Sequence, residues 1–339
     1  MAVDSDSGPL DEAEQAEGML GVARSVVSTC LAVRREDTVL VITDPMTSTI
    51  ARALYEAAAR ITERLILVMI PPSLKRGAEI PSVVADLMRN ADVIIIATRN
   101  SFTHTRARAN ASREGARVAS MPGIDAEVMA HGMPEDYTAL RREIRGMNSV
   151  FRRRRNVHVT TPAGTDVRFT TGSRWILDDN GLIVRPGAVG NLPAGKIFVL
   201  PQEGTASGTI VIDSTWEGRI LEEPLRFDVE DGLVTSIEGG GLADEIKSIL
   251  ELAKSGLRRN RERAYTLAEF GFGMNSRARL LGNRLEDQVV RGSAYFSFGD
   301  NTALGGTAKV GVKMSGVMSK PSCTLDDITL ISEGKVTAS

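Results

Sequence analysis

The chain has 339 residues, enough for about two domains of ~150 residues each. With 42% hydrophobic and 25% charged residues and a formal net charge of −2, it is neither disordered nor basic enough to make nucleic acid an expected partner. No apolar run approaches the ~20 residues of a membrane span, and residues 1–20, with six acidic and no basic side chains, do not resemble a signal peptide. We therefore expect a soluble cytoplasmic protein with no membrane partner.

Up to about residue 120, short apolar runs alternate with segments of helical periodicity. The predicted strands are Thr38–Thr43, Leu65–Ile70, Asp92–Thr98 and Arg117–Met121, and the predicted helices are Asp11–Val33, Thr47–Arg64 and Ile80–Asn90. Strands that are apolar along their whole length and alternate with helices indicate a parallel sheet covered on both faces. Residues 1–150 are therefore predicted to form a doubly wound, Rossmann-like α/β domain.

A charged helix over Glu135–Arg155 is predicted next, with the boundary between domains near residues 145–157. It ends in four consecutive arginines, residues 152–155. The side chains of such a run point in different directions round a helix. They usually form a solvated helix end, where positive charge is favoured by the helix macrodipole. Contact with an anionic ligand or another subunit is the alternative.

After residue 156, short strands and turn residues dominate. The predicted strands are His158–Thr161, Asp166–Thr171, Lys196–Leu200, Gly208–Asp213, Leu225–Val229, Leu233–Ile237, Gly292–Phe298, Ala308–Lys313 and Ile328–Ser332. One helix is predicted over Ala243–Leu257, and Asp231-Gly232 between two alternating runs predicts a hairpin. Residues 151–339 are expected to form an α+β domain with a mostly antiparallel sheet.

One candidate site follows the predicted strand Asp92–Thr98. Ligands of open α/β sheets bind just beyond the carboxyl ends of the strands. Ser101, Thr103 and His104 lie there, and an imidazole flanked by hydroxyls can bind a polar substrate or transfer a proton. The alternative is that His104 only caps the loop.

Two carboxylates are further candidates. Glu203 follows the strand predicted to begin at Lys196, and Glu269 lies among apolar residues and glycines. A carboxylate in such surroundings is usually paired, ligating or protonated, because an isolated buried charge is unfavourable. A structural ion pair or helix cap is the alternative for Glu269. The sequence lacks the dinucleotide fingerprint after a strand, the phosphate-binding loop and the common hydrolase motifs.

Five segments in order carry a resemblance to known proteins: residues 101–123, 190–213, 267–275, 285–301 and the tail around Pro321 and Asp326. Together they resemble the thermophilic (leucyl) aminopeptidase T/S family and its relative 2,5-dihydroxypyridine 5,6-dioxygenase. The serine-histidine loop in the first segment is more similar to the dioxygenase. The resemblance implies an N-terminal α/β domain, a C-terminal domain that carries the active site, and a homodimer.

The resemblance also implies metal ligands, most of which are replaced in this chain. The peptidase branch binds two divalent ions through glutamates, histidines, a tyrosine and an aspartate, and the dioxygenase branch binds ferrous iron through histidines, an aspartate and a serine. At the matching positions Glu269 and Asp287 are retained. The replacements are Lys196 for a glutamate, Tyr295 for a histidine, Thr302 for a tyrosine or serine, and Lys313-Met314-Ser315 for a closing His-x-Asp.

These replacements predict a protein with no catalytic metal and no cofactor. The chain has three histidines and none after His158, and a lysine ammonium has no lone pair for a metal. We expect Lys196 and Lys313 to place positive charge where relatives hold metal ions. A bolder hypothesis makes Lys313 and Ser315, which share a face if they lie on a strand, a base and nucleophile pair.

We therefore expect a metal-independent enzyme that acts on a small polar molecule. His104, Glu203, Glu269 and Tyr295 are its candidate acid–base and orienting groups, with Lys313 and Ser315 as the further catalytic pair. The candidate ligand-binding residues are Ser101, Thr103, Lys196, Asp287 and Thr302. Two alternatives stay open: a non-catalytic descendant that binds a ligand or pairs with an active relative, and an enzyme with a residual metal site.

Overall fold

The computed structural model describes residues 12–72, 78–133, 136–151, 154–172 and 177–337. The chain divides into two compact units, residues 1–133 with 181–193, and residues 134–180 with 194–339. The sequence placed the boundary near residue 150, but helix α6 (Tyr137–Phe151) belongs to the second unit. Within this second unit, Arg291 donates to Glu143 of α6 at 2.5 Å. The segment 181–193 returns to the first unit and adds a strand to its sheet.

Unit 1 contains a five-stranded sheet in the order β2-β1-β3-β4-β8, with every neighbouring pair parallel. The strands are β1 (Val39–Thr43), β2 (Leu65–Met69), β3 (Val93–Ala97), β4 (Arg117–Ser120) and β8 (Val189–Asn191). The helices are α1 (Glu12–Ser25) with its continuation η1 (Val26–Cys30), α2 (Ser48–Ala59), α3 (Ser82–Arg89), α4 (Arg106–Arg113) and α5 (Ala126–His131). This confirms the predicted doubly wound α/β class.

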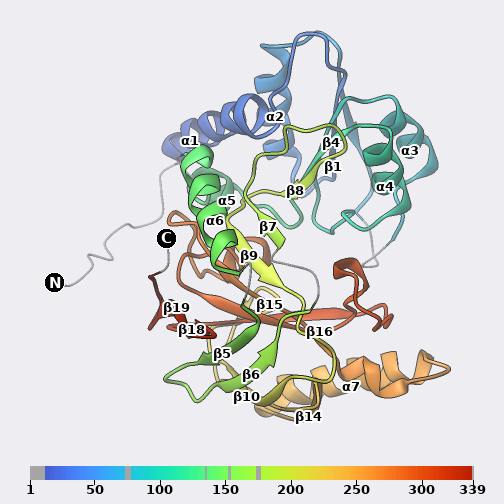
Figure 1. Ribbon diagram of the computed structural model, residues 1–339. Helices are drawn as coiled ribbons and strands as arrows, with labels where there is room; N and C mark the ends of the chain where they lie inside the picture. The colour runs from blue at the N-terminus through green and yellow to red at the C-terminus, as the bar shows by residue number, and fades with distance from the viewer. Residues whose placement is uncertain (1–11, 73–77, 134–135, 152–153, 173–176, 338–339) are drawn as a thin grey trace. The chain divides into compact units, whose positions relative to one another are not determined.

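The central strands β1 and β3 are almost entirely apolar because both faces of the sheet are covered there. β1, β3 and β4 are buried at every residue. On one face Leu40, Ile94 and Val118 pack against Met88 of α3 and Ala111 of α4, and Figure 1 shows these two helices side by side. The opposite face packs against α2, which in turn contacts α1 and α5.

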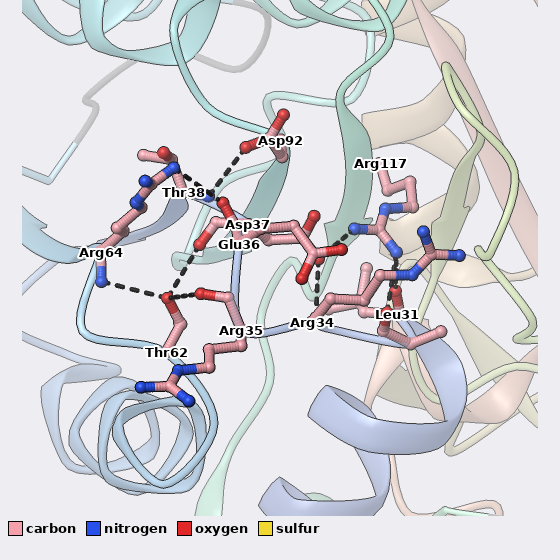
Figure 2. Close-up of polar contacts among 11 residues, drawn as sticks. Leu31, Arg34, Arg35, Glu36, Asp37, Thr38, Thr62, Arg64, Asp92 and Arg117 are labelled. Atoms are coloured by element: carbon pink, nitrogen blue, oxygen red, sulfur yellow. Dashed lines mark hydrogen bonds and ion pairs between the residues drawn. The ribbon is translucent and has the colours of Figure 1, made fainter.

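A buried ion pair lies at the end of the helical segment that precedes β1 (Figure 2). Arg117, the first residue of β4, donates to the Leu31 carbonyl at 2.6 Å and to Asp37 Oδ2 at 2.5 Å. The side chains of Arg117 and Asp37 are only 9% and 10% exposed, and the Arg34 N–H donates to the same carboxylate at 2.7 Å. A cation on the last carbonyls of a helical segment opposes its negative end, so Arg117 ties this segment to the sheet.

Unit 2 contains two antiparallel sheets, in the orders β14-β13-β10-β6-β5-β18-β19-β20 and β12-β11-β17-β16-β15-β9-β7. The strands of the first are β5 (Asn156–Thr160), β6 (Asp166–Thr170), β10 (Ser207–Ile212), β13 (Leu225–Glu230), β14 (Leu233–Glu238), β18 (Ser322–Leu325), β19 (Ile328–Ser332) and β20 (Lys335–Val336). Those of the second are β7 (Leu177–Asp179), β9 (Lys196–Val199), β11 (Thr215–Trp216), β12 (Arg219–Ile220), β15 (Leu267–Gly273), β16 (Ala294–Gly299) and β17 (Lys313–Met318). Besides α6, the helices are α7 (Gly240–Gly256), which contacts β14, α8 (Arg284–Asp287) and two 3-10 turns, η2 (Arg261–Tyr265) and η3 (Thr302–Leu304). The expected α+β, mostly antiparallel class is confirmed.

Aromatic side chains fill the core between these two sheets. Phe227 of β13 stacks on Phe298 of β16 with ring centroids 4.5 Å apart, and Phe169 of β6 meets Phe270 of β15 edge-on at 5.4 Å. Successive side chains of a strand point to opposite faces. The apolar residues of β15, β16 and β9 therefore face this core, and the residues between them form a second face of the seven-stranded sheet.

The element predictions were right for most strands and wrong for one. The predicted hairpin at Asp231-Gly232 is confirmed, with positive φ angles of 48° and 77°. A strand over Ala308–Lys313 was predicted, whereas β17 begins at Lys313. The preceding residues form a loop because the Asp300 carboxylate accepts the N–H groups of Val310 and Gly311 at 2.8 and 2.9 Å.

Two further findings concern the helices. Residues 152 and 153 of the arginine run lie outside the described residues, while Arg154 pairs with Asp327 at 3.1 Å. No helix in the described part of the chain is long and apolar enough to cross a membrane.

Candidate functional site

The second face of the seven-stranded sheet in unit 2 brings together four residues that are distant in sequence. Across the central strands, Gly271 pairs with Tyr295 and Gly273 with Lys196, while Lys313 pairs with Gly299. The register and the two-residue period place Glu269, Tyr295, Lys313 and Lys196 on this face. We call these four residues the Glu269 cluster.

Glu269 is the acidic centre of the cluster and is 4% exposed. Its Oε1 accepts a hydrogen bond from the hydroxyl of Tyr295, and its Oε2 accepts one from the ammonium of Lys313. Burial alone would raise the pKa of Glu269, but the charges of Lys313 and Lys196 and these hydrogen bonds outweigh it and lower the pKa. Glu269 is therefore an ionised, fully engaged carboxylate.

Burial and the nearby Glu269 charge keep the Tyr295 hydroxyl protonated. Its side chain is fully buried, and burial together with the adjacent Glu269 charge raises the Tyr295 pKa well above 10. The ring lies directly over Gly271, where a Cβ atom would come within 2.5 Å of the ring carbons and the hydroxyl. Glycine at this position therefore creates the space that lets Tyr295 reach Glu269.

Lys196 has a different environment from Lys313. Its Nζ donates to Gln288 Oε1 at 2.9 Å and lies 5.3 Å from the ring centroid of Tyr295 and 5.4 Å from that of Phe198. Among the described residues it forms no ion pair with a carboxylate. Burial lowers the Lys196 pKa and the charge of Lys313 adds to the effect, while Glu269 and Asp179 oppose it.

Asp287 supports the site from the loop that carries Gln288. It is completely buried, and its Oδ1 accepts the N–H groups of Leu281 and Gly282, both at 3.2 Å. Burial raises the Asp287 pKa, partly offset by hydrogen bonds from Thr215 and the backbone. Asp287, predicted to bind ligand, thus fixes the turn that places the neighbouring Gln288 on Lys196.

Ser315 lies on the same strand face as Lys313, as the spacing predicted. Its hydroxyl is hydrogen-bonded to that of Ser297 at 2.8 Å, and its N–H donates to Glu217 at 2.7 Å. The ammonium of Lys313 is directed instead to Glu269. The hydrogen bonds thus engage the two residues with different partners, and nothing in this geometry makes Lys313 the base that activates Ser315.

Glu203 and Thr302 belong to a separate network in unit 2. Glu203 Oε1 accepts the N–H of Thr307 at 2.7 Å and the amide of Asn301 at 2.9 Å, and Thr302 donates to Asp300 at 2.5 Å. Burial acts to raise the Glu203 pKa, but these bonds outweigh it and lower the pKa. Both residues organise the loop before β17, and no contact between described residues joins them to Glu269.

Ser101, Thr103 and His104 lie in unit 1, in the loop after β3. Ser101 donates to Thr103 Oγ1 at 3.0 Å, and Thr103 is hydrogen-bonded to Ser120 at the end of β4 at 2.8 Å. His104 is exposed. The three residues form a hydroxyl-rich loop at the carboxyl edge of the parallel sheet, where the α/β fold places ligand sites.

The Glu269 cluster does not fit a divalent metal ion. Metal sites of this type need several carboxylate or imidazole donors converging on one point. In the described part of the chain no group of three or more histidines, cysteines, aspartates or glutamates is arranged in that way. Around Glu269, the space next to the carboxylate holds the Lys313 ammonium, which has no lone pair to donate while protonated.

Two residues of this site, Phe198 and Gln288, were not predicted from the sequence. Both had a usable signal. Phe198 is two residues after Lys196 on a predicted strand and so shares its face, and Gln288 directly follows Asp287, which was singled out. Neither signal was strong, because the contact of Gln288 with Lys196 spans 92 residues of sequence.

Comparison with known proteins places this fold in a family. The sequence profile of the 2,5-dihydroxypyridine 5,6-dioxygenase family matches residues 19–338. A curated 2,5-dihydroxypyridine 5,6-dioxygenase from Pseudomonas putida is 25% identical over 228 residues, so the match spans 62% of this chain and 62% of the relative.

Two solved structures share the fold. The structure of the 2,5-dihydroxypyridine dioxygenase of Pseudomonas putida KT2440 superposes with a TM-score of 0.80 and 20% identity, over 98% of this chain and 99% of that one. AmpT from Thermus thermophilus superposes with a TM-score of 0.66 and 12% identity, over 95% and 99%. At these identities the structures show the fold, and the profile match shows the relationship. The chain belongs to the 2,5-dihydroxypyridine 5,6-dioxygenase family.

Proposed function

We propose that the protein is a metal-independent enzyme that binds a small polar molecule at the Glu269 cluster. One observation carries the proposal: the ammonium of Lys313 is hydrogen-bonded to the buried Glu269 carboxylate, and the charge of Lys196 acts on the same group. The charge that stabilises this carboxylate is thus supplied by the chain itself. No added cation is needed to keep the acid ionised in its buried position.

Two cations on a partly buried face can act on an oxygen of a ligand. Lys313 and Lys196 are each partly exposed, unlike Glu269 and Tyr295, so in this proposal a ligand contacts the two lysines and not the two buried residues. Fixed positive charge outside bulk water stabilises a carboxylate or the developing negative charge on a carbonyl oxygen. In this proposal Glu269 and Tyr295 orient Lys313 and the two lysines bind the ligand oxygens.

The partly exposed Phe198 ring, next to Lys196, favours a flat ligand. The name of the curated relative specifies a dihydroxypyridine, which is flat and carries two oxygens. Small oxygenated heteroaromatic rings and small carboxylates are therefore the first ligands to test. The fold shared with AmpT gives no separate support for peptidase activity, because unrelated activities occur on one fold.

The test is ligand binding by protein treated with EDTA. We expect at least one of 2,5-dihydroxypyridine, nicotinate and maleate to bind in isothermal titration calorimetry, and product formation to be detectable by proton NMR. Lys313→Met should abolish binding, and Lys309→Met, at an exposed lysine in the preceding loop, should leave it unchanged. Binding that requires added iron or zinc, or that survives Lys313→Met, would contradict the proposal. Binding with no turnover would favour the non-catalytic alternative.

A further inference from the structure

The two lysines of the Glu269 cluster have different hydrogen-bond partners, and the proposed function does not depend on this difference. Lys313 is engaged as a cation, since its ammonium donates directly to Glu269. Among the residues that the structure describes, Lys196 donates only to the neutral amide of Gln288, at 2.9 Å, and it lies over two aromatic rings. Burial desolvates Lys196 and the charge of Lys313 acts on it, and this is the environment that activates amine nucleophiles in proteins.

We propose that Lys196 is an amine nucleophile that condenses with the carbonyl group of a small aldehyde or ketone to form an imine. The proposal rests on the proposed function only in taking the Glu269 cluster as the ligand site. It adds the class of ligand, a carbonyl compound, and a covalent step.

The step balances without any oxidant or reductant. The lone pair of neutral Lys196 Nζ forms a bond to the carbonyl carbon as the C=O π pair moves to oxygen. The oxygen gains a proton and Nζ loses one, which gives a carbinolamine. The carbinolamine hydroxyl then takes up a proton and leaves as water while the nitrogen lone pair forms the C=N bond, and the nitrogen releases its remaining proton. One amine and one carbonyl group thus yield one imine and one water molecule.

The neighbouring residues suit each part of this step. Burial lowers the Lys196 pKa; the charges of Glu269 and Asp179 oppose this and that of Lys313 adds to it, and the net lowering increases the fraction of neutral amine. The Lys313 ammonium, held by Glu269, lies on the same sheet face and can serve as a proton donor for the step. The ring of Phe198 beside Lys196 offers an apolar surface for the rest of the ligand. Gln288, as a neutral partner, positions the nitrogen without keeping it charged.

Reductive trapping tests the proposal on the whole protein. The protein is incubated at neutral pH with benzaldehyde and sodium cyanoborohydride, which converts an imine into a stable benzylamine. Intact mass and peptide mapping then locate the label. Two lysines of α7 serve as internal references for ordinary reactivity: the exposed Lys247, paired with Asp244, and the partly exposed Lys254, paired with Glu251.

We expect Lys196 to be labelled several-fold faster than Lys247 and Lys254. Lys196→Arg keeps the positive charge but forms no such imine, so it should lose this label while the two reference lysines react as before. Labelling of Lys196 no faster than of the references would overturn the proposal, whether or not any ligand of the proposed function binds. If ligand binding is found and is kept in Lys196→Arg while Lys196 is not trapped, the electrostatic role stands and the imine does not.

Discussion

Removing the charge of Lys313 should destabilise unit 2 more than removing the charge of Glu269. The Glu269 side chain is 6% exposed, and Lys313 is 29% exposed. Breaking a buried ion pair by removing one partner costs about 3–5 kcal/mol. Because Lys196 and Tyr295 remain near Glu269, we expect Lys313→Met to lower the free energy of unfolding by about 2–3 kcal/mol, below that range. In Glu269→Gln the Lys313 ammonium can turn to water, so about 1–2 kcal/mol is expected.

A double-mutant cycle isolates the interaction between the two side chains. The double variant leaves no isolated buried charge, so it should be less destabilised than the sum of the two single variants by at least about 1 kcal/mol. The measurement is urea unfolding followed by tryptophan fluorescence, since Trp216 stacks on Phe227 in the core of unit 2. Additive effects within error would show that the two side chains do not interact in solution, and the description of the site would then be wrong.

Three further predictions concern the same site and the first unit. The folded pKa of Glu269 is lowered, so the ionised Glu269 carboxylate stabilises the fold above its unfolded pKa, about 4.3. This stabilisation is lost as the pH falls through the folded pKa, and Glu269→Gln should therefore flatten the acid side of the curve of stability against pH. Gly271→Ala should cost about 1–3 kcal/mol by displacing the Tyr295 ring, whereas Gly241→Ala, with open space around it, should not destabilise; thermal unfolding of both variants compares them. Arg117→Met leaves the Asp37 carboxylate buried and should cost about 3–5 kcal/mol in chemical unfolding, and a loss under 1 kcal/mol would contradict the assigned role.

The sequence was sufficient for unit 1 because its strands are defined locally. Three of the four predicted strands from Thr38 to Met121 have an uninterrupted apolar centre, Arg117–Met121 being the exception, and all four became strands of the parallel sheet. Such runs need no knowledge of pairing to be recognised. The glycine-rich strand β15 offered no such signal, since Gly271 and Gly273 lower strand propensity and are explained only by the groups packed on them.

The candidate site was predictable only as a set of residue types. Glu269, Tyr295, Lys313 and Lys196 were named from aligned segments, and the structure brings them onto one sheet face. That Glu203 joins a separate network could not be inferred, because its partner Thr307 is 104 residues away and the loop between them has no periodic pattern. Strand register between distant segments is the missing information, and a shift of one residue would move a side chain to the other face.

The central claim is that the chain's own ammonium groups, and no metal ion, supply the positive charge at Glu269. The most direct measurement is the metal content of protein purified without chelator and without nickel affinity resin, by inductively coupled plasma mass spectrometry. The account predicts iron, zinc and manganese far below one atom per chain, in both the wild type and Glu269→Gln. A metal content near one atom per chain in the wild type that is lost in Glu269→Gln would contradict it, and would return metal chemistry to this site.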